Sequence, residues 1–157
     1  MSYLTQKTIK NNISFSGIAL HSGLDVNVCI KPASPNYGIV FKRVDLNKNN
    51  MVYPNFMNVT NTSLNTTIEN EFGVKVSTIE HLMCALFGLG IDNALIEIDN
   101  EEVPILDGSA KIFIEKIISA GIKTSEIPIK IIKINKEVSY SQGERYINIK
   151  PSTLSLD

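Results

Sequence analysis

The chain has 157 residues, of which 43% are hydrophobic and 20% charged, with 15 basic and 16 acidic side chains. This length allows one hydrophobic core, and the net charge of -1 gives no electrostatic reason to bind nucleic acid or an anionic membrane. No apolar run approaches the ~20 residues of a membrane-spanning helix. We therefore expect a globular protein that has no nucleic-acid partner and is not an integral membrane protein.

The use of cysteine predicts a reducing compartment. The chain has two cysteines, Cys29 and Cys84, and residues 1–10 lack the basic and then apolar pattern of a signal peptide. We expect two free thiols and a cytoplasmic location. A metal pair of His81 and Cys84 is disfavoured, because a structural zinc site needs four ligands and Cys29 has no partner at a suitable spacing.

The first half of the sequence predicts short strands. One strand is expected over residues 5–15, followed by a turn in which Gly17 and Gly23 flank His21. From residue 24 to 31 apolar and polar residues alternate strictly, which predicts a strand with one face on the core. The apolar members of this strand are Leu24, Val26, Val28 and Ile30. Further predictions are a strand at 38–43, a polar loop at 44–58, and a hairpin whose strands at 64–68 and 74–77 flank a four-residue turn.

The period then changes to that of a helix. Apolar residues follow the i, i+3, i+4, i+7 spacing of an amphipathic helix at Ile79, Leu82, Met83 and Leu86. Ser77 and Glu80 match a capping box, which predicts that the helix begins at residue 77. Gly88 and Gly90 are expected to end it.

A strand at 94–98, a short strand at 104–106 and a second helix follow. Asp107, Gly108 and Ser109 are predicted to cap the second helix and Gly121 to end it, with Ile114, Ile117 and Ile118 facing inward. Strands followed by a helix, a strand and a helix predict an α+β fold, a two-layer sandwich of a mixed or antiparallel sheet packed on helices. We assign this domain to residues 1–126.

Residues 127–157 predict the start of a second unit. Strands are expected at 129–135, 138–140 and 146–150, with a turn at 141–143, and residues 154–157 are interpreted as the middle of a further strand. No helix follows to cover these strands, and such a small sheet cannot bury a face by itself. We therefore predict an incomplete, truncated domain.

Glu80 and His81 are the strongest candidates for chemistry. By one interpretation, favoured on pattern alone, Glu80 caps the helix and His81 is a partly buried helix residue bonded to a neighbouring carbonyl. By the other, His81 binds zinc and Glu80 is the general base beside a zinc-bound water, whose pKa the metal can lower to about 7. A catalytic zinc needs about three protein ligands. The residues alone therefore suggest an incomplete site.

Three more residues have a simple structural interpretation, and His21 and Arg145 have a functional one as well. His21 is most simply a polar loop residue, and alternatively a proton donor or phosphate contact at the rim of a cleft. Asp107 is most simply a helix cap. Arg145, beside Gly143 in a predicted hairpin turn, is most simply solvated, although a single arginine on a turn can bind phosphate.

Longer motifs carry a resemblance to a known family. The run STIEHLMCALFGLGIDNALIEID at 77–99, followed by EVPILDGSA at 102–110, closely resembles the UDP-3-O-acyl-N-acetylglucosamine deacetylases, the zinc enzymes of the committed step of lipid A synthesis in Gram-negative bacteria. The segments SGIALHSG at 16–23, RVDL at 43–46 and AGI at 120–122 agree with it. The resemblance extends along the whole chain.

The resemblance implies two similar α+β domains with the active site between them. This chain would carry the whole first domain and the opening strands of the second. The remaining zinc ligands would come from an H-x-x-x-D motif far into the second domain, which the resemblance places beyond Asp157. That domain would also supply the acyl passage, an oxyanion-stabilising threonine and a further histidine.

The resemblance also implies roles for individual residues. It makes His81 a ligand of Zn²⁺ and Glu80 the general base. The positions implied on the substrate side are His21, Leu64, Asn65 and Arg145. Cys84 occupies a position that small apolar residues usually fill, so we expect it in the core.

The implied reaction is removal of the N-acetyl group from a UDP-linked, 3-O-acylated glucosamine, with the second domain of the same polypeptide completing the site. We expect the 157-residue chain alone to be inactive and to bind zinc weakly at most. The alternative is a non-catalytic domain or paralogue that acts as an interaction module. Coding sequence beyond Asp157 discriminates the two, because an H-x-x-x-D motif supports the enzyme and a stop codon supports the module. An RNA-binding α+β domain is disfavoured by the charge balance.

Overall fold

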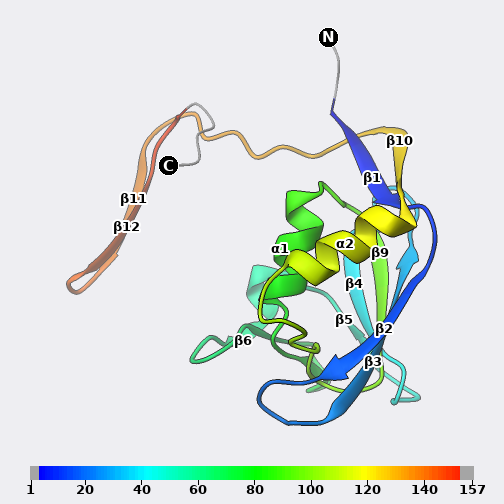
Figure 1. Ribbon diagram of the computed structural model, residues 1–157. Coiled ribbons are helices and arrows are strands. Elements are labelled where there is room, and N and C mark those ends of the chain that lie inside the picture. Colours follow the sequence, from blue (N-terminus) through cyan, green and yellow to red (C-terminus); the bar gives the residue numbers. More distant parts are fainter. Residues whose placement is uncertain (1–3, 153–157) are drawn as a thin grey trace.

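The computed structural model describes residues 4–152 and confirms the α+β class (Figure 1). Its centre is a five-stranded sheet in the order β2-β3-β9-β4-β5. The neighbours β4 and β9 are parallel and the other pairs are antiparallel, so the sheet is mixed, as predicted. The strands are β2 (Ile13–Ile18), β3 (Asp25–Pro32), β4 (Ile39–Arg43), β5 (Met51–Val52) and β9 (Ala94–Ile98). The strand predicted at 154–157 lies outside the described residues.

Two helices form the second layer. Helix α1 (Glu80–Gly88) and helix α2 (Lys111–Ala120) contact each other and cover one face of the sheet (Figure 1). The predicted inward residues Leu82 and Leu86 of α1 are buried, and Met83 packs against the core. Neither helix, nor any other in the part of the chain that the structure describes, is long and apolar enough to cross a membrane.

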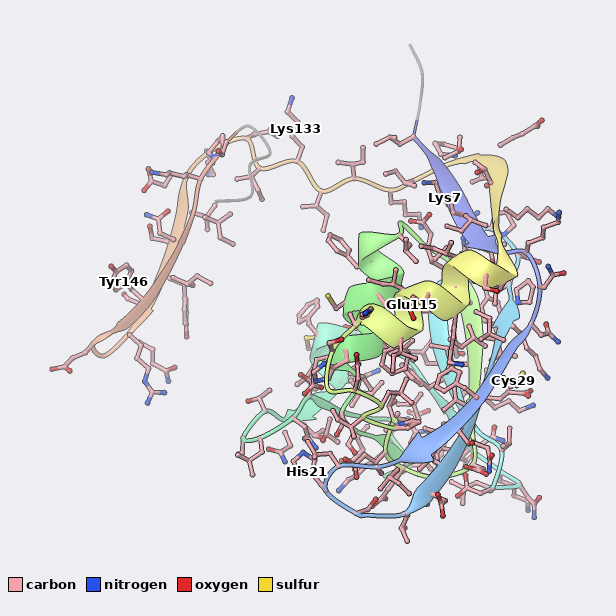
Figure 2. All side chains as sticks on the ribbon, viewed as in Figure 1. Lys7, His21, Cys29, Glu115, Lys133 and Tyr146 are labelled. Carbon is pink, nitrogen blue, oxygen red and sulfur yellow. The ribbon has the colours of Figure 1, made fainter. Side chains whose placement is uncertain are left out.

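The alternation in β3 separates the two faces of the sheet. Val26, Val28 and Ile30 are buried under the helices, whereas Leu24 precedes the strand and is 51% exposed, contrary to prediction. On the opposite face Lys31 pairs with Glu97 at 2.6 Å. Figure 2 shows Cys29 on this polar face, turned away from the helices. One face of the sheet therefore builds the core and the other meets solvent.

Smaller sheets flank the central one. Strand β1 (Thr5–Ile9) pairs with β10 (Ile122–Pro128), so the strand predicted at 5–15 is two strands, β1 and β2. Strands β6 (Val59–Asn61), β7 (Thr67–Glu69) and β8 (Lys75–Val76) form a second small sheet, which confirms the predicted hairpin between β7 and β8. The predicted loop at 44–58 also holds β5 and a short 3-10 helix, η1 (Phe56–Asn58). The strand predicted at 104–106 is reduced to an isolated bridge between Pro104 and Ala19.

Helix α2 buries most of the predicted face. Ile117 is buried and Ile114 packs against the core, as predicted, whereas Ile118 is 59% exposed and Phe113 is buried instead. The Phe113 ring meets Phe15 of β2 edge-on, with 5.6 Å between ring centroids, which is consistent with the inward position of Phe113. The Ser109 hydroxyl oxygen accepts the Lys111 N–H at 3.1 Å, which supports the predicted start, and Gly121 follows the last residue of the helix with a φ of 81°.

The last described strands form a hairpin that stands apart from the rest (Figure 1). Strand β11 (Val138–Gln142) pairs antiparallel with β12 (Arg145–Ile149), and every residue of both is exposed. The strand predicted at 129–135 is wrong, because this segment is irregular and its neighbour β10 pairs with β1 instead. Strand β10 ends at Pro128, just past the predicted boundary at residue 126. The assignment of residues 127–157 to a second domain stays a prediction.

Candidate functional site

The start of α1 differs from the predicted capping box. The helix begins at Glu80 rather than at residue 77, and no side chain caps it. Thr78 has a φ of 54°, so the chain turns sharply between Ser77 and the helix. The Ser77 hydroxyl consequently donates to the Glu101 carbonyl at 3.1 Å, away from the amides of α1. The prediction that Glu80 caps the helix, which the pattern alone favoured, is therefore wrong.

The Glu80 carboxylate faces the loop between β6 and β7. Its Oε2 accepts the Thr66 N–H at 3.1 Å, and no hydrogen bond from within residues 4–152 reaches Oε1. The side chain is half-buried in the first turn of α1, where the helix dipole favours a negative charge. One oxygen fixed by a backbone amide and one available oxygen suit a general base.

His81 follows Glu80 in the same turn and is half-buried. The interpretation in which its ring bonds a neighbouring carbonyl is wrong, because the imidazole forms no hydrogen bond within the described part of the chain. Its ring nitrogens are therefore available to a ligand. The structure confirms the position of His81 in the first turn of the helix and leaves its metal role a prediction.

Asn65 is linked to the residue that precedes the helix. Its Nδ2 donates to the Thr78 hydroxyl oxygen at 3.2 Å, and its Oδ1 accepts the Thr67 hydroxyl at 3.0 Å. Two hydrogen bonds thus join the loop between β6 and β7 to the start of α1. Asn65 of the loop bonds Thr78, and Thr66 of the loop bonds Glu80; both Asn65 and Glu80 are half-buried. The structure brings these two predicted residues together.

Glu102, which the sequence interpretation missed, joins His21 to this group. Its side chain is only 2% exposed, and its two oxygens accept the His21 N–H at 2.9 Å and the Ser22 N–H at 2.8 Å. The Thr78 hydroxyl donates to the same carboxylate at 3.0 Å. The available signal was an acidic residue followed directly by the apolar run VPIL.

The environment of Glu102 favours its charged form. Burial raises the pKa of this carboxyl, but the hydrogen bonds from the His21 and Ser22 amides and from the Thr78 and Ser22 hydroxyls outweigh burial, so the pKa lies below its ordinary value. The imidazole of His21 itself lies on an exposed turn, which Figure 2 shows at the end of the body opposite β10.

Two predicted substrate residues lie outside this network. Leu64 is 83% exposed in the loop between β6 and β7. Arg145 begins β12, in the hairpin that stands apart from the body, so the structure does not bring it to the other candidates (Figure 1). Cys84 is exposed, contrary to the predicted core position, because it lies on the solvent side of α1, two residues beyond the buried Leu82.

The donors present offer only part of a zinc site. His81 supplies a half-buried imidazole next to a carboxylate, which suits a catalytic zinc. Among residues 4–152, however, no three or more His, Cys, Asp or Glu side chains are grouped so that they could hold a metal ion. A zinc ion in a catalytic geometry would need about two further ligands from outside these residues.

Comparison with known proteins identifies the family. The family model for UDP-3-O-acyl N-acetylglycosamine deacetylase matches residues 6–157. Curated proteins named UDP-3-O-acyl-N-acetylglucosamine deacetylase are similar to this chain: that of Cellvibrio japonicus is 44% identical over 148 residues and that of Histophilus somni 41% over 148 residues. Each match covers 94% of this chain and 48% of the relative, so the chain spans about half the length of these proteins. The chain belongs to the UDP-3-O-acyl N-acetylglycosamine deacetylase family.

Proposed function

We propose that this chain is the part of a zinc-dependent UDP-3-O-acyl-N-acetylglucosamine deacetylase that carries the general base and one metal ligand. The observation that carries the proposal is the pair at the start of α1. One oxygen of Glu80 is held by the Thr66 amide, and the His81 ring forms no hydrogen bond among residues 4–152. Family membership supports the same assignment. The substrate would be a UDP-linked, 3-O-acylated N-acetylglucosamine, and the products the free amine and acetate.

Glu80 would accept the proton of the attacking water. Oε1, which no group in residues 4–152 occupies, would receive the proton while the Thr66 amide keeps the side chain in place through Oε2. His81 would hold Zn²⁺, which when bound acidifies water and polarises the amide carbonyl. His21, Leu64 and Asn65 would border the substrate, and Arg145 would approach the nucleotide phosphates only if the hairpin docks near the site.

The rest of the site would come from chain outside the described residues. The relatives are about twice as long as this chain, and the hairpin of β11 and β12 is exposed throughout. Both facts support the proposal that residues 127–157 open a second domain of the same polypeptide. The proposed compartment is the cytoplasm, which agrees with free thiols at Cys29 and Cys84.

The test uses the intact protein that the gene encodes. Glu80→Gln should lower kcat by about 10²- to 10⁴-fold, the usual contribution of a general base, and leave the zinc content unchanged. His81→Ala should lower both activity and zinc content. Glu101→Gln, at an exposed carboxylate outside the network, is the matched control. Normal turnover in both Glu80→Gln and His81→Ala would overturn the proposal.

The 157-residue chain provides a second measurement. It should show no deacetylation of the UDP-sugar and only weak zinc binding by equilibrium dialysis, because one ligand cannot fix the metal. Robust hydrolysis by this chain would show that the site is complete without a second domain.

A further inference from the structure

The carboxylate of Glu102 connects parts of the site that are far apart in sequence. It accepts the amides of His21 and Ser22 in the turn between β2 and β3, and the hydroxyl of Thr78 just before α1. These bonds are 2.8 to 3.0 Å long and span 24 to 81 positions of sequence. One buried side chain thus fixes the His21 turn relative to the residue two positions before Glu80.

Thr78 itself is held in a costly conformation. Its φ of 54° lies in the left-handed region, which a β-branched residue rarely adopts, and its side chain is 2% exposed. The hydroxyl donates to Glu102 and accepts from Asn65. These two bonds stabilise the left-handed conformation of Thr78. With the backbone in this conformation, Glu80 does not cap the helix and its side chain accepts the Thr66 N–H instead.

Stability alone is a weak explanation for a charge at this position. A buried carboxylate loses its hydration, and apolar residues of similar volume often stabilise a protein at least as well. Within residues 4–152 no cation forms an ion pair with Glu102, so hydrogen bonds alone compensate for the burial. What these bonds provide specifically is geometry, because they orient two backbone amides and the hydroxyls of Thr78 and Ser22 at once.

We propose that Glu102 is a positioning residue that fixes the His21 turn against the entry to α1, so that His21, Asn65 and Glu80 keep one arrangement for substrate. The proposal deepens the proposed function and rests on it. Glu102 does not touch the reacting atoms. Its carboxylate acts through the His21 and Ser22 amides on the substrate side and through Thr78 on the side of the general base.

The first measurement follows the bonds in the 157-residue chain. In ¹⁵N–¹H correlation spectra, Glu102→Gln should move the amide resonances of His21 and Ser22, because the single oxygen of a neutral amide cannot replace the two carboxylate oxygens that accept these N–H groups. The amide resonance of Thr78 should move as well, since the Thr78 hydroxyl donates to the same carboxylate. Glu101→Gln changes the neighbouring exposed carboxylate in the same way and should leave those resonances in place. Unchanged His21 and Ser22 resonances in a folded Glu102→Gln chain would overturn the proposal.

The second measurement uses the intact protein, well below the melting temperature of each variant. Glu102→Gln should lower kcat/KM by about tenfold or more, mainly through KM, with unchanged zinc content, since small misplacements near a site can reduce rates up to about 10²-fold. Thr78→Val, which removes the hydroxyl and keeps the shape, should act in the same direction. Thr78→Ser keeps the hydroxyl and should restore most of the activity.

The outcomes separate this proposal from the proposed function. Wild-type kcat/KM and KM in Glu102→Gln overturn the positioning role while the deacetylase assignment stands. If Glu102→Gln does not fold, Thr78→Val provides the test. Wild-type kinetics in Thr78→Val would then overturn the positioning role of Glu102. If the intact wild-type protein loaded with zinc does not deacetylate the UDP-sugar, the proposed function fails, and the spectra still decide whether Glu102 orders the His21 turn.

Discussion

The body of the molecule, residues 4–128, and the hairpin at 138–149 form strands by the same local rules but differ in what covers them. In the body, β3 and β9 place Val28, Ile30 and Ile96 under two helices, all at most 2% exposed. In the hairpin, Tyr140 and Tyr146 are 66% and 82% exposed. Figure 2 shows Tyr146 far from the body. Alternation and a turn are thus enough to define a strand pair, whereas stability requires a second layer.

From this comparison we expect the largest loss of stability from a substitution in the core of the body. Phe113→Ala should lower the free energy of unfolding by about 3 to 5 kcal/mol, because it empties a site under α2 and removes the edge-on contact with Phe15. Urea denaturation of the chain measures it. Phe87→Ala, at a ring that is 89% exposed, is the matched control and should change little. A cost below about 1 kcal/mol for Phe113→Ala would contradict the assigned core.

We expect a smaller loss of stability when the body is exposed to acidic pH. The hydrogen bond from Arg43, against the opposing effect of partial burial, holds the pKa of Asp45 below its ordinary value. A carboxyl whose pKa is lowered on folding stabilises the protein above its ordinary pKa, and this contribution is lost as the pH falls through the folded-state value. Stability should therefore fall below about pH 4, with a contribution from Glu102 in the same sense.

The acid effect can be assigned by substitution. Asp45→Asn should cost about 1 kcal/mol at pH 7 and reduce the loss of stability below pH 4, because the two bonds from Arg43, at 2.6 and 2.9 Å, no longer join opposite charges. Asp25→Asn, at an exposed carboxylate of β3, serves as control. Denaturant midpoints measured from pH 7 to pH 3 give both quantities. An unchanged acid dependence in Asp45→Asn would exclude this ion pair as a source.

The smallest effect is expected in the hairpin. Tyr146→Ala should change the unfolding free energy of the body by no more than about 0.5 kcal/mol, as exposed substitutions usually do. Removal of residues 131–157 should likewise leave the melting temperature of the body unchanged, because β10 ends at Pro128 and keeps its pairing with β1. A clear loss of stability on truncation would show that the hairpin packs on the body in solution.

Where prediction from sequence failed, contacts between distant segments were responsible. The spacing of Ser77 and Glu80 fits a capping box, but the left-handed turn at Thr78 and the bond to Thr66 direct both side chains elsewhere. Phe113, which is buried where Ile118 was expected, contacts Phe15, almost a hundred positions earlier. Periodicity within a segment cannot report such partners.

The sequence by itself determined the α+β class, the alternation of β3, the inward face of α1 and the motifs that identify the family, because these depend on local spacing and residue type. It also singled out Glu80 and His81. Only the tertiary structure decided that Glu102 joins the His21 turn to Thr78, and that Arg145 lies away from the other candidates. The reason is physical: a buried carboxylate is satisfied by donors from whichever segments the fold brings to it, and chain order does not specify them.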